Sequence, residues 1–203
     1  MTLVLASASP RRKALLEQIG ADFVVRVSQV IEDNDQQLLP QKLVVLQARQ
    51  KAEAVAHEWF NESAANARQD VVIGADTIVV VDGQVYGKPR DGQDAFRMLT
   101  KLSGRSHQVI TGVAVVKQSK SSCQKWTSFT ASVMTNVTFC HLRPETIQSY
   151  IATGEPFDKA GAYAIQGKGI LFVEKISGDY TNVVGLPLTT LATLLTKVGV
   201  KLL

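Results

Sequence analysis

The segment LASASPRR, residues 5–12, gathers hydrogen-bond donors and positive charge at one point of the chain. Ser7 and Ser9 offer hydroxyl groups, while Arg11 and Arg12 offer fork-shaped guanidinium groups that suit phosphate oxygens. A helix that begins here adds free backbone N–H groups and the positive end of its dipole. The pattern is typical of a phosphate site, and a helix cap with two arginines in water is the alternative.

A carboxylate interrupts an apolar strand in VVIGADTIVVV, residues 71–81. Burial of Asp76 there without a partner would cost several kcal/mol. Gly74 and Ala75 leave room beside it for another group to approach. The pattern favours a metal ligand or a general base at Asp76, and a carboxylate bonded to neighbouring backbone amides is the alternative.

Two lysines stand at unusual places. Lys51 lies on the apolar stripe of a helix, so its side chain points toward the body of the protein. It is either a cation that faces a cleft or a stem that reaches back to water. Lys88 stands between Gly87 and Pro89, and the proline restricts its backbone and therefore its direction. Taken alone, Lys88 is better explained as a surface lysine.

An acid and an amide complete the set of candidate residues. Glu32 lies in SQVIEDND, a loop dense with acids, and a solvated loop is its simpler interpretation. Gln166 lies in the glycine-rich segment AGAYAIQGKG. Its side chain has one acceptor and two donors, the inventory needed to recognise the edge of a nucleobase. A flexible loop with an exposed amide is the alternative for Gln166.

The surrounding pattern predicts the elements that must position these side chains. Hydrophobic periodicity and turn residues predict strands at 2–6, 22–27, 71–81, 107–118, 126–139 and 170–176 and helices at 10–20, 40–59, 91–102, 144–152 and 187–198. Asp82-Gly83 predicts a two-residue hairpin turn after the strand that carries Asp76. Residues 153–169 are expected to form a functional loop. The order predicts one α/β domain over residues 1–203, with a mixed sheet and antiparallel hairpins.

Composition excludes several classes of protein. The chain has 203 residues, of which 45% are hydrophobic, and no apolar run reaches the length of about 18 residues that a membrane span needs. The first residues lack a secretory pattern, so we expect a cytoplasmic protein. Two cysteines and three histidines without metal-binding spacing argue against a disulfide framework or a zinc site. The net charge of +4 favours anionic partners, but no aromatic and basic residues alternate as a nucleic-acid surface would require.

Taken together, these residues resemble the Maf family of nucleoside triphosphate pyrophosphatases. The similarity covers essentially the whole chain in the order of the family, and it is carried by LASASPRR, ARQKA, GADTIVVVDGQVYGKP, FDKAGAYAIQGKG and VVGLPL. The resemblance implies an α/β fold related to inosine triphosphate pyrophosphatases. It also implies an elongated mixed sheet flanked by helices and two lobes with a central cleft.

The resemblance implies hydrolysis of a nucleoside triphosphate to the monophosphate and pyrophosphate with a divalent cation, Mg²⁺ or Mn²⁺. It assigns catalysis to Asp76, Lys51 and Lys88, with the two lysines binding phosphate, and metal binding to Glu32 with Asp76. It assigns substrate binding to Ser7, Arg11, Arg12, Thr77 and Gln166, and Ser9 joins them as a further hydroxyl donor. Ile31 stands where the family often has Asp, and Asp33 follows Glu32. The metal acid is therefore either Glu32 or Asp33.

Within the family, this chain resembles the subgroup that acts on dTTP and UTP at Thr77 and Gln166. Thymine and uracil present an N3–H donor flanked by carbonyl acceptors, which a neutral amide can bind at both points. Modified pyrimidine nucleotides are a further expected substrate. The alternatives are a nucleotide-binding regulator of cell division that acts at septum formation, and a pyrophosphatase specific for 7-methyl-GTP or purines. Since family members often form dimers, a homodimer is also expected.

Overall fold

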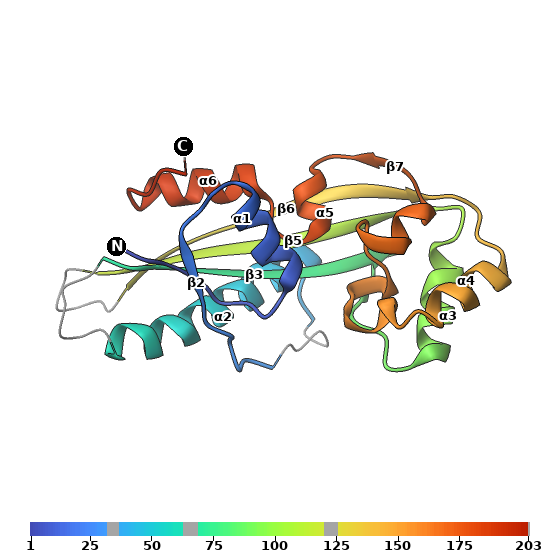
Figure 1. Ribbon diagram of the computed structural model, residues 1–203, viewed down its shortest axis with the longest axis horizontal. Coiled ribbons are helices and arrows are strands. Elements are labelled where there is room, and N and C mark those ends of the chain that lie inside the picture. The colour runs from blue at the N-terminus through green and yellow to red at the C-terminus, as the bar shows by residue number, and fades with distance from the viewer. Residues whose placement is uncertain (32–36, 63–68, 120–125, 203) are drawn as a thin grey trace. The chain divides into compact units, whose positions relative to one another are not determined.

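The computed structural model describes residues 1–31, 37–62, 69–119 and 126–202. Within these residues the strands form one seven-stranded sheet in the order β2-β1-β3-β5-β6-β7, with β4 paired to β3 (Figure 1). Pairing of β1 with β2 and β3 is parallel, whereas β3–β4 and β6–β7 are antiparallel. The predicted mixed α/β sheet is therefore confirmed. The strands are β1 (Leu3–Leu5), β2 (Phe23–Val25), β3 (Val71–Val81), β4 (Gln84–Tyr86), β5 (Ser106–Gln118), β6 (Trp126–Phe139) and β7 (Val173–Ser177).

The helices flank this sheet. They are α1 (Pro10–Gln18), α2 (Pro40–Glu62), α3 (Gly92–Leu102), α4 (Pro144–Ile151), α5 (Tyr180–Val184) and α6 (Leu188–Lys197). Three short 3₁₀ helices lie between α4 and β7: η1 (Glu155–Asp158), η2 (Ala160–Ala162) and η3 (Gly167–Phe172). No helix among the described residues has both the length and the apolar character that crossing a membrane requires.

The chain divides into two compact units. The first unit comprises Met1–Asp76, Thr111–Val133 and Gly185–Leu203, and the second comprises Thr77–Ile110 and Met134–Val184. The division falls within β3, between Asp76 and Thr77. Two units agree with the two lobes expected from the family, while the cleft and the single domain over residues 1–203 stay predictions.

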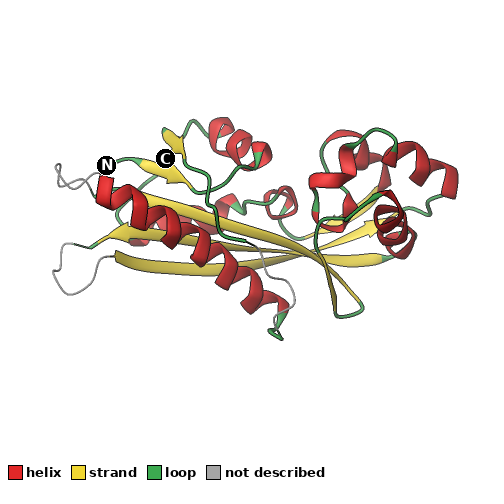
Figure 2. Cartoon of the chain, turned by 90° about the horizontal axis from the view of Figure 1, so that it is seen from below, coloured by secondary structure: helices red, strands yellow, loops and turns green. Residues whose placement is uncertain are grey.

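In the first unit, the long helix α2 packs directly on the sheet (Figure 2). A Cβ atom at Gly74 of β3 would lie 2.2 Å from the carbonyl oxygen of Ala48, and one at Gly112 of β5 would lie 2.2 Å from that of Val44. Both glycines are therefore needed because the helix backbone occupies the space of a side chain. The space predicted beside Asp76 at Gly74 is thus filled by α2 rather than left open to a ligand.

Neighbouring side chains of β6 show which helix covers each face of the sheet in the first unit. Ser128 Oγ donates to Glu53 on α2, at 2.8 Å, whereas Phe129 lies beneath the ammonium group of Lys197 on α6. Since alternate residues of a strand point to opposite faces, α2 and α6 cover opposite sides of this part of the sheet, as Figure 1 also shows.

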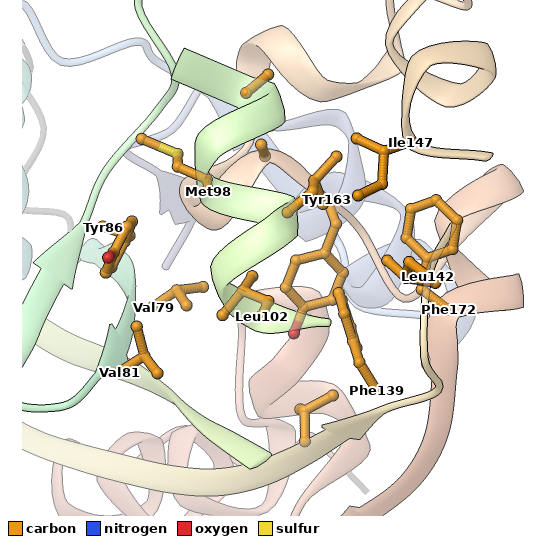
Figure 3. Close-up of a cluster of buried hydrophobic side chains, with 14 of the residues drawn as sticks. Val79, Val81, Tyr86, Met98, Leu102, Phe139, Leu142, Ile147, Tyr163 and Phe172 are labelled. Atoms are coloured by element: carbon orange, nitrogen blue, oxygen red, sulfur yellow. The ribbon is translucent and has the colours of Figure 1, made fainter. Parts of the chain in front are cut away.

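The second unit has its own core, which is built around aromatic side chains (Figure 3). Tyr163, Phe139 and Phe172 pack edge to face, and helices α3 and α4 close the cluster with Met98, Leu102 and Ile147. Edge-to-face packing is the arrangement that aromatic quadrupoles prefer. This core supports the segment between α4 and β7, which carries Gln166.

One local prediction needs correction in the second unit, because the strand expected at 170–176 begins only at Val173, after η3. The structure adds detail that was not predicted: the segment expected to form a functional loop contains η1, η2 and the start of η3, and α5 follows β7. Phe172 is 3% exposed, but Ile170 and Leu171 are 54% and 78% exposed, so this apolar run does not alternate as a strand would. The hairpin turn is as predicted, with positive φ at Asp82 (51°) and Gly83 (75°).

Candidate active site

The N-terminus of α1 holds the predicted phosphate-binding residues. Ser9 is the N-cap, and its hydroxyl accepts from the backbone N–H of Arg12 at 3.5 Å. Ser7 is buried two residues after β1 and accepts from the backbone N–H of Ser9 and from Nη1 of Arg12, at 3.2 and 3.1 Å. Because these bonds use the lone pairs of Ser7 Oγ, its O–H remains available as a donor.

Arg12 is fixed from a second direction as well. Its Nε donates to the carbonyl oxygen of Gly185 at 2.8 Å, and this residue comes from the segment that leads into α6. The guanidinium group is thus held by two parts of the chain that are distant in sequence. Arg11 lies beside it in the first turn of α1 and is half-buried. A group held in this way loses little conformational freedom when it binds an anion.

A buried ion pair joins α2 to β3. Lys51 Nζ lies 2.6 Å from Asp76 Oδ1, and the two residues are 7% and 3% exposed. The side chain of Lys51 thus points toward the body of the protein and does not reach back to water, whereas the cleft that it was expected to face stays a prediction. The approach of α2 at Gly74 positions this pair, because Ala48 and Ala52 on either side of Lys51 contact Gly74.

The second oxygen of Asp76 has no hydrogen-bond partner in the part of the chain that the structure describes. Oδ2 is also buried. An unsatisfied buried carboxylate oxygen is unfavourable unless a further group binds it. A hard divalent cation prefers such an oxygen, so Asp76 fits the predicted metal role.

The other predicted metal ligands are not among the residues that the structure describes. Glu32 and Asp33 lie in the segment 32–36, outside the described residues. Among the residues that are described, no group of three or more acidic, histidine or cysteine side chains could hold a metal ion. The metal ligand set therefore stays a prediction that rests on Asp76 Oδ2.

Sequence reasoning passed over a polar residue near Lys51. Gln47 lies one turn earlier on α2 and is only 2% exposed. Residues four apart on a helix occupy the same face, so Gln47 adds an amide to the face that carries Lys51. The available signal was a polar residue inside the apolar stripe of this helix, the same signal that identified Lys51.

The other predicted site residues belong to the second unit. Thr77 follows Asp76 on β3 and is half-buried, and strand alternation points its side chain to the opposite face. Lys88 is exposed in the connection between β4 and α3. The preceding residue, Gly87, accepts from the backbone N–H of Gly161 in η2 at 3.0 Å. This bond ties the Lys88 connection to the segment that continues to Gln166.

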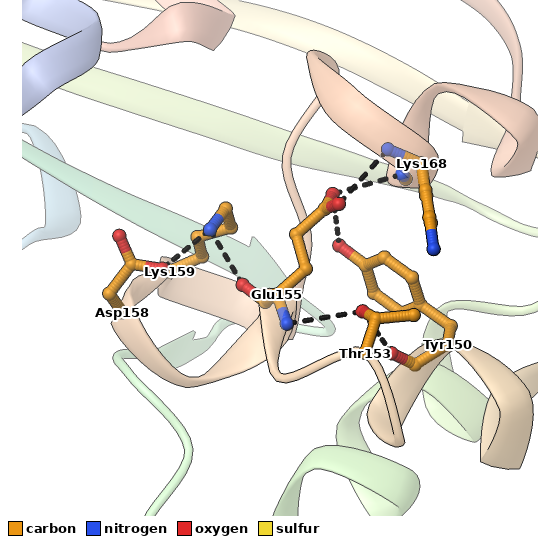
Figure 4. A network of polar contacts seen from close by, with 7 residues as sticks. Tyr150, Thr153, Glu155, Asp158, Lys159 and Lys168 are labelled. Atoms are coloured by element: carbon orange, nitrogen blue, oxygen red, sulfur yellow. Dashed lines mark hydrogen bonds and ion pairs between the residues drawn. The ribbon is translucent and has the colours of Figure 1, made fainter.

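Gln166 lies immediately before η3 in an extended conformation, with φ −99° and ψ 160°. It is half-buried, and the preceding Ile165 is buried in the protein. A carboxylate that the sequence analysis did not single out, Glu155, bonds to the backbone just beyond Gln166 (Figure 4). Its partners lie 13 and 14 residues away, so sequence spacing offered no signal for them.

Comparison with known proteins shows which family the chain resembles. The model of the family described as Maf-like protein matches residues 2–198. Proteins named dTTP/UTP pyrophosphatase from Dictyoglomus turgidum and Symbiobacterium thermophilum are 46% and 48% identical, over 99% and 97% of this chain and 98% and 94% of their own. One from Moorella thermoacetica is 48% identical over 98% of this chain and 95% of its own.

Among solved structures, a nucleoside-triphosphatase (dITP/XTP pyrophosphatase) from Mycobacterium abscessus has a TM-score of 0.38 and 14% sequence identity, and it covers 70% of this chain and 76% of its own. At this level the likeness supports no inference. The family model, by contrast, covers nearly all residues, and the relatives are similar over almost their full length. The chain therefore belongs to the Maf family.

Proposed function

We propose that this chain hydrolyses dTTP and UTP to the nucleoside monophosphate and pyrophosphate. The observation that carries the proposal is the buried Lys51–Asp76 pair, whose second carboxylate oxygen has no partner among the described residues. A buried acid with one oxygen held and the other unsatisfied is suited to bind a reacting group. The names of the relatives support the reaction and the pyrimidine substrates.

In the proposed reaction, a water molecule attacks a phosphorus of the α–β phosphoanhydride and its proton passes to a base. Lys51 holds Oδ1 of Asp76 at 2.6 Å, so Oδ2 is the oxygen that would accept this proton. The ammonium group of Lys51 also neutralises the carboxylate, which reduces its repulsion of the phosphates. Lys51 is thus expected to orient Asp76 as the base and to reduce the repulsion between its carboxylate and the phosphates.

A divalent cation, when bound, would neutralise phosphate charge and orient the attacking water. Asp76 Oδ2 is the described oxygen that could hold it, and Glu32 is the second predicted ligand. While Lys51 occupies Oδ1, the cation and the proton would each need one of the two lone pairs of Oδ2.

The remaining cations would stabilise the negative charge that develops on pyrophosphate as it leaves. Arg12 is already oriented by Ser7 and Gly185, and Arg11 lies in the same first turn of α1. Lys88 would contribute a further charge from the connection tied to Gly161. These groups act by position and charge, which is the main requirement of phosphoryl transfer.

Selection of the base is assigned to Gln166 and Thr77. The amide of Gln166 would accept from N3–H of thymine or uracil and donate to an adjacent carbonyl. Thr77 is small and uncharged, which leaves space for a pyrimidine. The cytoplasmic location and the homodimer expected from the sequence stay predictions.

The test is a substrate panel with separate detection of pyrophosphate and orthophosphate. The purified chain is incubated with dTTP, UTP, CTP, ATP, GTP and 7-methyl-GTP, in Mg²⁺ or Mn²⁺ and in excess chelator. We expect release of pyrophosphate that requires the cation, with the highest kcat/KM for dTTP and UTP. Direct release of orthophosphate would contradict the chemistry, whereas a preference for CTP or a purine would contradict only the assignment of the base.

A further inference from the structure

The Glu155 carboxylate is the centre of a hydrogen-bond network in the second unit (Figure 4). Its Oε1 accepts from the hydroxyl of Tyr150 at 3.0 Å and from the backbone N–H of Gly169 at 3.1 Å. Its Oε2 accepts from the backbone N–H of Lys168 at 3.0 Å. One side chain therefore bonds α4 to the start of η3.

The network stabilises the charged form of Glu155. Burial alone would raise the pKa of this carboxyl group, but the bonds from Lys168, Gly169 and Tyr150 outweigh it and lower the pKa below its usual value. Hydrogen bonds to an ionised acceptor are stronger than those between neutral groups. The contact with the 168–169 backbone is thus a strong local constraint.

This constraint acts directly beside Gln166. A Cβ atom at Gly167 would lie 2.9 Å from both carboxylate oxygens of Glu155, so the residue after Gln166 is in close contact with the carboxylate. Gly167 has a φ of +73°, which turns the chain there. Gln166 is therefore fixed between buried Ile165 on one side and the Glu155 contact on the other.

The position of Lys88 depends on different bonds. The Lys88 connection is tied through the Gly161 N–H to the Gly87 carbonyl, at 3.0 Å, which does not involve the Glu155 side chain. The main chain of Glu155 is held separately, since its carbonyl accepts from Lys159 Nζ at 2.6 Å. A change confined to the Glu155 carboxylate would therefore disturb Gln166 while it spares the connection that carries Lys88.

We propose that Glu155 is a positioning residue that holds Gln166 for recognition of the pyrimidine base and so determines how well the enzyme discriminates dTTP and UTP from CTP. The proposal rests on the pyrophosphatase function proposed above. Glu155 acts through the backbone of Gly167, Lys168 and Gly169 and is not expected to touch the substrate. The carboxylate therefore contributes to selectivity and not to the chemical step.

The first test is Glu155→Gln, which retains the size of the side chain but replaces one oxygen with an NH₂ group. The backbone N–H of either Lys168 or Gly169 then faces this NH₂ donor in place of an acceptor oxygen. We expect the ratio of kcat/KM for dTTP to that for CTP to fall about tenfold, mainly through a higher KM for dTTP. The kcat for dTTP should stay within about twofold, because the Lys88 connection is unchanged. Glu174→Gln, at an exposed glutamate of β7, is the matched control and should change neither quantity.

A second pair of variants tests the same contact without removal of the acid. Gly167→Ala places a methyl group against the Glu155 carboxylate, whereas Gly83→Ala introduces an alanine at a similar φ of +75° with nothing within 4 Å. Both variants place an alanine at nearly the same positive φ, but only Gly167→Ala meets the carboxylate, so only Gly167→Ala should lose discrimination. Calorimetric binding of a non-hydrolysable dTTP analogue provides a readout that is independent of turnover, and Glu155→Gln should weaken this binding about tenfold.

The outcomes separate the two proposals. If the unmodified chain does not prefer dTTP and UTP, the proposed function is wrong. If it does, and both Glu155→Gln and Gly167→Ala keep the dTTP-to-CTP ratio, the role of Glu155 is wrong. An equal fall in kcat for all nucleotides with an unchanged ratio would also overturn it, because that result indicates a catalytic or general structural role. If Glu155→Gln does not fold, the comparison of Gly167→Ala with Gly83→Ala decides.

Discussion

The close packing of α2 on β3 predicts that Gly74→Ala will uncouple Lys51 from Asp76. The new methyl group would lie 2.2 Å from the Ala48 carbonyl oxygen and 2.8 Å from Ala52 Cβ, where ordinary contacts begin at 3.4 Å. The obstructing oxygen belongs to the backbone, so the helix must withdraw by about 1 Å. The Lys51–Asp76 distance, now 2.6 Å, would then pass the limit for a hydrogen bond of about 3.5 Å.

This displacement has two measurable consequences. Overpacking of this kind costs about 1–3 kcal/mol in the free energy of unfolding, which corresponds to a loss of about 2–12 °C in Tm for a chain of this size. A shift of about 1 Å in a catalytic group costs on the order of a hundredfold in rate. We therefore expect a folded protein whose kcat/KM for dTTP falls far more than its Tm alone would explain.

Gly112→Ala is the matched control for this experiment. Its methyl group would meet α2 equally closely, at 2.2 Å from the Val44 carbonyl oxygen, but seven residues before Lys51. We expect a similar loss of Tm, measured by thermal unfolding, and a smaller loss of dTTP turnover. If the two variants lose Tm and turnover to the same extent, the register of α2 at Gly74 is not what positions the Lys51–Asp76 pair.

Three other perturbations address the site and the second unit. Asp76→Asn should lower dTTP turnover by roughly 10²–10⁴-fold, because the amide cannot act as a base. Calorimetry should show nucleotide affinity that is unchanged or higher, since one negative charge near the phosphates is removed, and near-normal turnover would place the base elsewhere. Lys88→Ala should slow turnover by roughly 10- to 1,000-fold, without a change in Tm, since the residue is exposed, and Lys175→Ala on β7 is its control. His107 is buried against Tyr163, and burial lowers its pKa from 6.5 to about 4. Because the unfolded chain takes up this proton first, stability should fall by about 3 kcal/mol as the pH drops from about 6.5 to about 4. Urea unfolding across this range should show that the free energy of unfolding falls with pH, and His107→Gln should reduce this dependence. An equal dependence in both proteins would assign the effect to other groups.

Several features could be predicted from sequence because their causes are local. The Ser9 cap depends on residues within three positions, and the Asp82-Gly83 turn depends on two. The inward direction of Lys51 follows from the helical period alone. What the sequence could not indicate was its partner, since Asp76 lies 25 residues away and the contact depends on the docking of α2.

The segment between α4 and β7 was the least predictable part of the fold. Its 3₁₀ helices have three to six residues each, too few for a period to be recognised. Glycines with positive φ, such as Gly161 and Gly167, divide it into turns. The bonds that hold it come from Glu155, whose acceptor role appears only once α4 and η3 are in place. Sequence analysis identified Gln166 by its chemistry but had no means to identify what positions it.

Lys51 and Asp76 are each anomalous in sequence, and the structure shows that each explains the other. A lysine on the apolar stripe of α2 and an acid within an apolar strand would both be unfavourable without a partner. Their pairing does not by itself favour the fold, because the desolvation of two charges offsets most of their attraction, and apolar side chains of similar size would fill the space at no greater cost. The pair also leaves Asp76 Oδ2 buried without a partner among the described residues, a cost that pairing with Lys51 does not remove. The proposed function supplies a reason for an arrangement that contributes so little to stability, because Oδ2 would bind a group during the proposed reaction.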